Sequence, residues 1–179
     1  MRDVVIAITA ASYRNKGAAA MLQSSIRQLY EKYGERLNIN LMSVYPQEDK
    51  KQIPWDFIKI VSCKPEQLLF IAFPLAVLYK VFHFCPPIKR LLLKNKILKA
   101  YYNTDVVLDE AGISFVDSRG FIMNTYAFVC AAVPMLMGVP VMKYSQAMGT
   151  FHSFWNRFLA KWILPKMQLI CARGKGTLE

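Results

Sequence analysis

Short apolar runs alternate with longer segments of helical periodicity along most of the chain. Runs rich in β-branched residues predict strands at residues 4–9, 37–45, 57–63, 105–109, 141–146 and 168–173. Apolar residues that recur every three or four positions predict helices at residues 17–33, 121–137 and 154–164. The stretch at residues 46–54 is rich in turn-forming residues and predicts a loop. Because such alternation is typical of a parallel sheet with helices on both faces, we predict an α/β fold.

The loops that follow the strands are where a site is expected, because ligands of open parallel sheets bind beyond the carboxyl ends of the strands. These loops lie at residues 10–16, 110–120, 147–153 and 174–177. In the first loop, Asn15, Lys16 and Gly17 precede a helix whose first backbone N–H groups are suited to bind an anion. The sequence contains neither a Walker A motif nor G-x-G-x-x-G, and a solvated basic turn is the alternative interpretation.

Two carboxylates directly follow the predicted strand at residues 105–109. Asp109 and Glu110 are followed by Gly112, so ionisable groups gather at one strand end beside a flexible residue. A carboxylate in this position can orient a sugar hydroxyl or act as a general base. We therefore predict that Asp109 and Glu110 are catalytic and that Gly112 belongs to the binding site. The alternative for Asp109 is that it caps the following turn, a frequent role of aspartate.

Polar residues also follow the strand at residues 141–146. Ser145, Gln146 and Gly149 are suited to the recognition of a hydroxylated ligand. Arg173, at the end of the last predicted strand, is suited to bind a phosphate or a carboxylate. For Arg173 the alternative is an internal ion pair with one of the two carboxylates above.

Composition narrows the class of protein and its partners. Hydrophobic residues occupy 54% of the 179 positions, enough for a sizeable core, and we expect a single domain over residues 1–179. Lys and Arg number 23 against 12 Asp and Glu, and the net charge of +11 favours anionic partners. No recognised nucleic-acid-binding motif is present, so we predict no nucleic-acid partner. Neither the two histidines nor the four widely spaced cysteines show metal-ligand spacing, so we predict no metal site.

The segment at residues 65–100 has the most unusual composition, and we predict an apolar, basic helical insertion there. From residue 67 to residue 104 there is no acidic residue, whereas six basic residues occur. Pro74 and Lys80 interrupt the apolar run at residues 68–88, which argues against a helix that crosses a bilayer. Two interpretations remain open for residues 68–99. In the first, they form helices that lie on an anionic membrane surface. In the second, they form a buried helical hairpin with solvated lysines.

Several blocks of the sequence, in this order and spacing, resemble the polysaccharide pyruvyl transferase family. They are residues 15–22 (NKGAAAML), 105–117 (DVVLDEAGISFVD), 138–141 (GVPV), 145–149 (SQAMG) and 172–174 (ARG). The resemblance runs from residue 4 to residue 178 and omits about residues 47–102. Ala111 and Thr150 depart from the family pattern, which usually has Gly and Pro at these positions, and both lie in predicted acceptor-facing loops.

This resemblance implies transfer of a pyruvyl group from phosphoenolpyruvate to a pair of sugar hydroxyls on a cell-surface polysaccharide or its lipid-linked precursor. It implies no cofactor beyond this donor substrate. It also implies a Rossmann-like parallel sheet with helices on both faces, similar to the N-terminal domain of a GT-B glycosyltransferase. A second, donor-binding half would then be needed for catalysis. Residues 173–179 resemble the start of a further helix, so we expect a longer protein. No export signal precedes the first strand, so we expect a cytoplasmic protein at the inner face of the cell membrane.

Two other functions are compatible with the same residues. One is a GT-B glycosyltransferase that uses a nucleotide sugar as donor. The other is a non-catalytic module that binds a membrane surface.

Overall fold

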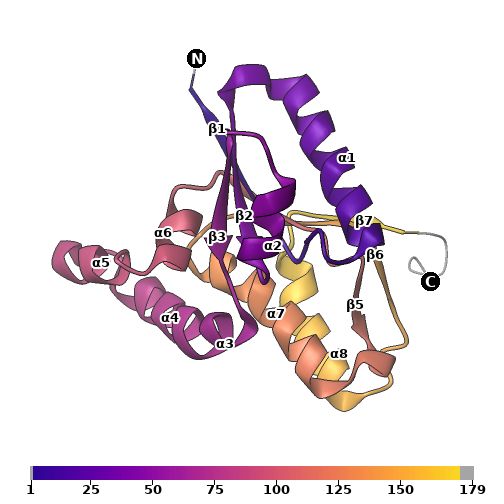
Figure 1. Ribbon diagram of the computed structural model, residues 1–179. Coiled ribbons are helices and arrows are strands. Elements are labelled where there is room, and N and C mark those ends of the chain that lie inside the picture. Colours follow the sequence, from indigo (N-terminus) through magenta and orange to yellow (C-terminus); the bar gives the residue numbers. More distant parts are fainter. Residues whose placement is uncertain (1, 174–179) are drawn as a thin grey trace.

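A parallel sheet lies at the centre of the fold, as the computed structural model shows for residues 2–173 (Figure 1). In this part of the chain the strands are β1 (Val4–Thr9), β2 (Leu37–Ser43), β3 (Ile58–Ser62), β4 (Val106–Asp109), β5 (Ile113–Val116), β6 (Val141–Gly149) and β7 (Leu169–Ala172). They lie in the order β3-β2-β1-β4-β6-β5, β7 pairs with β6, and every pairing is parallel. The predicted α/β, Rossmann-like sheet is therefore confirmed, while the likeness to a GT-B domain stays a prediction.

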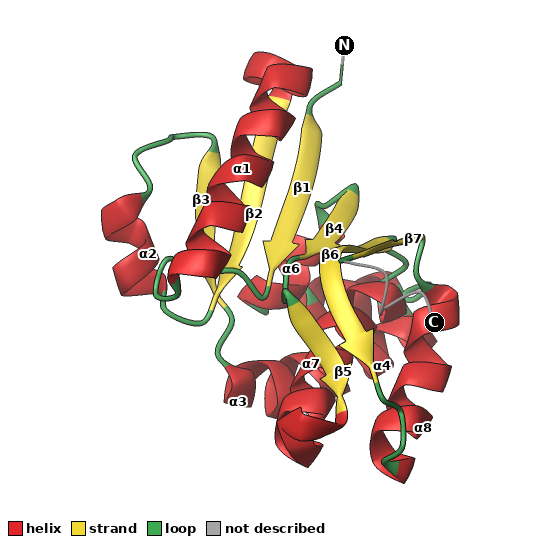
Figure 2. Ribbon diagram, turned by 90° about the vertical axis from the view of Figure 1, so that its right-hand side faces the viewer, coloured by secondary structure: helices red, strands yellow, loops and turns green. Residues whose placement is uncertain are grey.

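Helices cover both faces of this sheet (Figure 2). They are α1 (Lys16–Tyr33), α2 (Pro46–Gln52), α3 (Pro65–Gln67), α4 (Phe73–Phe82), α5 (Pro86–Leu92), α6 (Lys96–Tyr102), α7 (Gly120–Leu136) and α8 (Phe154–Ile163). Alternation along β1 separates two cores, because Ile6 and Ile8 pack with Leu22 of α1. The intervening Ala7 belongs to the cluster formed with α4, α6, α7 and α8. The sheet thus separates a face covered by α1 and α2 from a face covered by the other helices.

Two predicted loops contain regular structure. The stretch at residues 46–54 was predicted as a loop but contains α2, with Pro46 in its first turn and Glu48 and Asp49 near its positive end. Its seven residues are too few and too polar to show an apolar stripe, which explains the wrong prediction. The loop predicted at residues 110–120 contains β5, and β6 continues to Gly149, beyond the predicted end at residue 146.

The segment between β3 and β4 is helical and is buried on one side only. A π-helical turn at Leu68–Ala72 leads into α4. Leu68, Ala72, Ala76 and Tyr79 are buried against the core, whereas the side chains on the opposite side are exposed. Two helical segments, Pro65–Phe82 and Asp117–Leu136, are long and apolar enough to cross a membrane, although core helices of soluble proteins can have the same length and composition. One side of this segment is therefore packed in the core and the other side is exposed.

Candidate functional site

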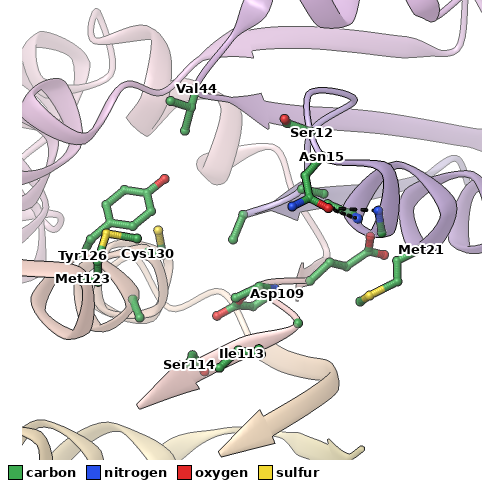
Figure 3. Close-up of a pocket in the computed structure, with 18 of the residues that line it drawn as sticks. Ser12, Asn15, Met21, Val44, Asp109, Ile113, Ser114, Met123, Tyr126 and Cys130 are labelled. Carbon is green, nitrogen blue, oxygen red and sulfur yellow. Dashed lines mark hydrogen bonds between the residues drawn. The ribbon is translucent and has the colours of Figure 1, made fainter. Parts of the chain in front are cut away.

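A cavity of about 360 Å³ opens where β1 and β4 end, between the first turn of α1 and the side of α7. Figure 3 shows Asn15, which precedes α1, and Met21 of α1 across from Tyr126 and Cys130 of α7, with Asp109 between them. The position agrees with the expectation that ligands bind beyond the carboxyl ends of parallel strands.

A break between β4 and β5 creates the space for this cavity. Both strands pair with the long strand β6, β4 near its start and β5 near its end. Between them Glu110 donates its backbone N–H to the carbonyl of Thr9 at 3.0 Å, and Gly112 has a φ of +67°. Glycine takes this left-handed conformation without a steric penalty, so the chain can turn sharply here. The residues of the break line the cavity instead of continuing the sheet.

Asp109 lies in a buried polar network. Its Oδ2 accepts a hydrogen bond from Nζ of Lys143, and the two side chains are 1% and 0% exposed. Its Oδ1 accepts the backbone N–H of Ala111 at 3.1 Å. Gln146 donates through Nε2 to the backbone oxygen of Asp109 at 2.9 Å, and its Oε1 accepts the hydroxyl of Ser114 at 2.5 Å. Asp109 thus has partners on both carboxylate oxygens, as a buried charge requires.

A bulge in β6 aims two residues of this network at Asp109. Ser145 has a φ of +54°, and the pairing of β6 with β7 shifts register between Lys143 and Gln146. In a regular strand, residues 143 and 146 would point to opposite faces. The extra residue turns both side chains to the same side.

Glu110 lies in a very different environment from that of its neighbour. The residue is 1% exposed and lines the cavity, and neither carboxyl oxygen has a hydrogen-bond partner. Burial raises the pKa of the Glu110 carboxyl from 4.5 to about 7; the nearby Ser25 hydroxyl counteracts part of this rise, and the charge of Asp109 adds to it. A pKa near neutrality allows the group to exchange a proton at physiological pH.

Asn15 forms the mouth of the cavity at the start of α1. Its Oδ1 accepts the backbone N–H groups of Gly17 at 2.9 Å and Ala18 at 3.2 Å, so these two donors are occupied by the helix cap. An anion bound at this helix start would have to displace the cap. The loop before Asn15 is fixed by α2, because Asp49 accepts the backbone N–H of Tyr13 at 2.8 Å and the hydroxyl of Ser43.

The family model for polysaccharide pyruvyl transferase matches residues 15–179. The chain belongs to the polysaccharide pyruvyl transferase family. This membership confirms the resemblance and indicates a transferase. No curated protein and no solved structure matches the chain significantly.

The structure brings together some of the site residues predicted for this pyruvyl transferase family member. Those that line the cavity are Asn15, Gly17, Asp109, Glu110, Gly112 and Arg173. Lys16 is exposed beside the cavity but does not line it, and Ser145 and Gly149 lie in β6 away from its wall. Gln146 is fully buried, does not line the cavity and donates a hydrogen bond to the backbone oxygen of Asp109. The predicted loop at residues 174–177 lies outside the described residues.

Other residues of the site were missed by the sequence analysis. Lys143 is the most important, and its only signal was a charged residue directly after the apolar Val141 and Met142 of a predicted strand. Its ammonium group forms an ion pair with the Asp109 carboxylate. Tyr126 and Cys130 form the wall on α7. Burial raises the pKa of the Cys130 thiol to about 12, which keeps it protonated and unsuited to act as a nucleophile.

Metal ligation finds no support among residues 2–173. No group of three or more His, Cys, Asp and Glu residues in this part of the chain is arranged to hold a metal ion. Of the two carboxylates at the cavity, Asp109 forms an ion pair with Lys143.

Proposed function

We propose that this chain takes part in transferring a pyruvyl group from phosphoenolpyruvate to two hydroxyls of one sugar, on a cell-surface polysaccharide or its lipid-linked precursor, in the cytoplasm. Phosphoenolpyruvate is the donor substrate, and the proposal includes no further cofactor. The observation that carries it is Glu110, a buried carboxyl that lines the cavity of a pyruvyl transferase family member and forms no ion pair with a described residue.

Glu110 is the proposed proton acceptor for an acceptor hydroxyl. Ketal formation makes two bonds from sugar oxygens to the central carbon of the donor and breaks the bond from that carbon to the phosphate oxygen. Of the two hydroxyl protons, one ends on the methylene carbon, which becomes a methyl group, and the other leaves with phosphate. A carboxyl with a pKa of about 7 is matched to relaying these protons near neutral pH.

Asp109 is proposed to position the site. Because Lys143, Ala111 and Gln146 already occupy its polar atoms, it holds the break after β4 in place next to Glu110. Arg119 and Arg173, which also line the cavity, are proposed to bind the anionic donor. Asn15 and the small residues Gly17 and Gly112 leave room for the acceptor sugar at the mouth.

The test offers isotope-labelled phosphoenolpyruvate and, separately, a labelled nucleotide sugar to the purified full-length protein with glycan acceptors. We expect label from phosphoenolpyruvate only, and we expect Glu110→Gln to slow its transfer about 100-fold or more. Glu48→Gln on α2 is the matched control, because it removes one exposed carboxylate outside the cavity. Transfer from the nucleotide sugar alone would instead identify a glycosyltransferase. An unchanged rate in Glu110→Gln would remove Glu110 from the mechanism.

A further inference from the structure

Large apolar side chains are exposed on the helices that cover the face of the sheet opposite α1. In α4 and the turn before it, Phe70, Pro74, Val77 and Val81 recur every three or four residues and are exposed. Phe70 is 72% exposed, and Phe84, just beyond the helix, is 74% exposed. The opposite side of the same helix is packed into the core, so α4 is apolar on both sides. A helix that is apolar all round normally has apolar surroundings on every side.

Aromatic contacts continue this surface across the neighbouring helices. Phe73 of α4 meets Phe128 of α7 with ring centroids 6.4 Å apart, and Phe128 meets Trp162 of α8 at 5.4 Å. Figure 1 shows α4, α7 and α8 side by side along the lower part of the molecule. We call the exposed apolar residues of this layer the outer helical face: Phe70, Ile71, Val77, Leu78, Val81, Phe84, Leu91, Phe154, Phe158 and Trp162.

Charge on these helices has one sign. No acidic residue occurs at residues 67–104 or 118–173, whereas Lys80, Arg90 and Lys94 are exposed beside the apolar residues of α4 and α5. On α8, exposed Arg157 and Lys161 alternate with exposed aromatic residues. The opposite face differs, because Arg27 of α1 pairs with Glu31 at 2.9 Å. An apolar surface interspersed with lysine and arginine complements a bilayer that contains anionic lipid.

We propose that the outer helical face docks onto the surface of a bilayer containing anionic phospholipid. The apolar side chains enter the boundary between headgroups and acyl chains, and the basic residues contact the headgroups. The helices lie on the membrane and do not cross it, because Leu68, Ala76 and Tyr79 are held in the core of the folded domain. Docking would place the protein where lipid-linked glycans are found, but it does not depend on the proposed catalytic activity.

Sedimentation of the full-length protein with vesicles tests this proposal without any assay of activity. We expect co-sedimentation with vesicles that contain phosphatidylglycerol and little with pure phosphatidylcholine. Equal binding to both kinds of vesicle, or binding to neither, would overturn the proposal. Oligomerisation through this face without lipid, detected by analytical ultracentrifugation and abolished by Phe84→Ser, would overturn it in favour of a second copy of the chain as the occupant.

A pair of charge variants locates the surface. Arg90→Gln with Lys94→Gln removes two exposed positive charges, and we expect about 30-fold weaker partitioning, since each basic residue near an anionic surface contributes about fivefold. Arg27→Gln with Lys32→Gln on α1 makes the same change in net charge on the opposite face and should bind like wild type. Equal losses in both pairs would contradict docking through this face.

A pair of double variants tests the contribution of the apolar side chains to membrane binding. Phe70→Ser with Phe84→Ser should weaken partitioning at least about tenfold, because two large apolar groups no longer enter the bilayer. Tyr30→Ser with Trp55→Ser removes two exposed aromatic side chains outside the outer helical face and should leave partitioning unchanged. Circular dichroism of the four double variants, two with altered charge and two with altered aromatic residues, establishes that each is folded. Wild-type binding by the phenylalanine variant would contradict the proposal.

Discussion

Two regions of this molecule depart in opposite ways from the usual pattern of apolar residues inside and charged residues on the surface. The network around Asp109 places an ion pair inside the protein, and the outer helical face places phenylalanine and leucine outside it. In the network each charge has a partner, so its burial is compensated within the fold. On the outer helical face the apolar groups have no partner among residues 2–173 that removes them from solvent. In the network around Asp109 the interactions are made within the fold. The outer helical face is suited to bind a partner outside the described residues.

Glu110 lies between these two cases. Glu110 is as buried as Asp109, but it has no cationic partner such as Lys143. The paired charges of Asp109 and Lys143 therefore stabilise the fold, whereas Glu110 and the outer helical face are available for chemistry or binding. The following predictions test that separation by the free energy of unfolding, measured with urea.

Breaking the buried ion pair should have the largest effect. Lys143→Met leaves the Asp109 carboxylate buried and uncompensated, and we expect a loss of about 3–5 kcal/mol in the free energy of unfolding. The double variant Lys143→Met with Asp109→Leu removes both charges and should recover most of that loss. A single variant within about 1 kcal/mol of wild type would mean that the pair is solvated and that the contrast with the outer helical face is wrong.

Replacing Glu110 should give a smaller effect that depends on pH. The Glu110 carboxyl has a pKa of 4.5 when unfolded and about 7 when folded, so its contribution to the stability of wild type falls as the pH rises from below 4.5 to above 7. The loss amounts to about 3 kcal/mol, and Glu110→Gln should not show it. The free energy of unfolding of Glu110→Gln minus that of wild type should therefore be larger at pH 8 than at pH 4. Parallel pH curves for the two proteins would show that Glu110 is not perturbed by burial.

Asn15, the N-cap of α1, is a polar residue that is exposed and yet has hydrogen-bond partners. Asn15→Ala removes the acceptor for the N–H groups of Gly17 and Ala18 and should cost about 1 kcal/mol. Asn15→Asp, which preserves the acceptor, should retain most of this stability. An alanine variant as stable as wild type would mean that water satisfies the two donors equally well.

Truncating the outer helical face should have the smallest effect on folding. Phe84→Ser removes a side chain that is 74% exposed and should change the free energy of unfolding by no more than about 0.5 kcal/mol. The same variant is expected to reduce vesicle binding, so stability and binding should respond independently. A loss above about 1 kcal/mol would assign Phe84 to the core.

The sequence alone was sufficient for the order of the main elements and for the general place of the site. Apolar runs such as Val4–Thr9 are long enough to identify buried strands, and the stripe from Leu22 to Tyr33 identifies α1. Loops after parallel strands converge at one edge of a sheet, which is why Asn15, Asp109 and Glu110 were correctly expected near each other. The family blocks were also readable as sequence, because their residues and spacing do not depend on coordinates.

The roles within the site depended on tertiary structure. Lys143 and Gln146 point to the same side only because β6 bulges at Ser145, and no pattern of period two predicts that. Likewise, the difference between Asp109 and Glu110 comes from which groups surround each carboxylate, and those groups lie up to 85 positions away in sequence, as Ser25 does from Glu110. The composition of residues 67–104 showed an apolar, basic segment, but only packing divided it into a buried and an exposed side. Local sequence determines which elements form, whereas burial and pairing are properties of residues brought together from distant parts of the chain.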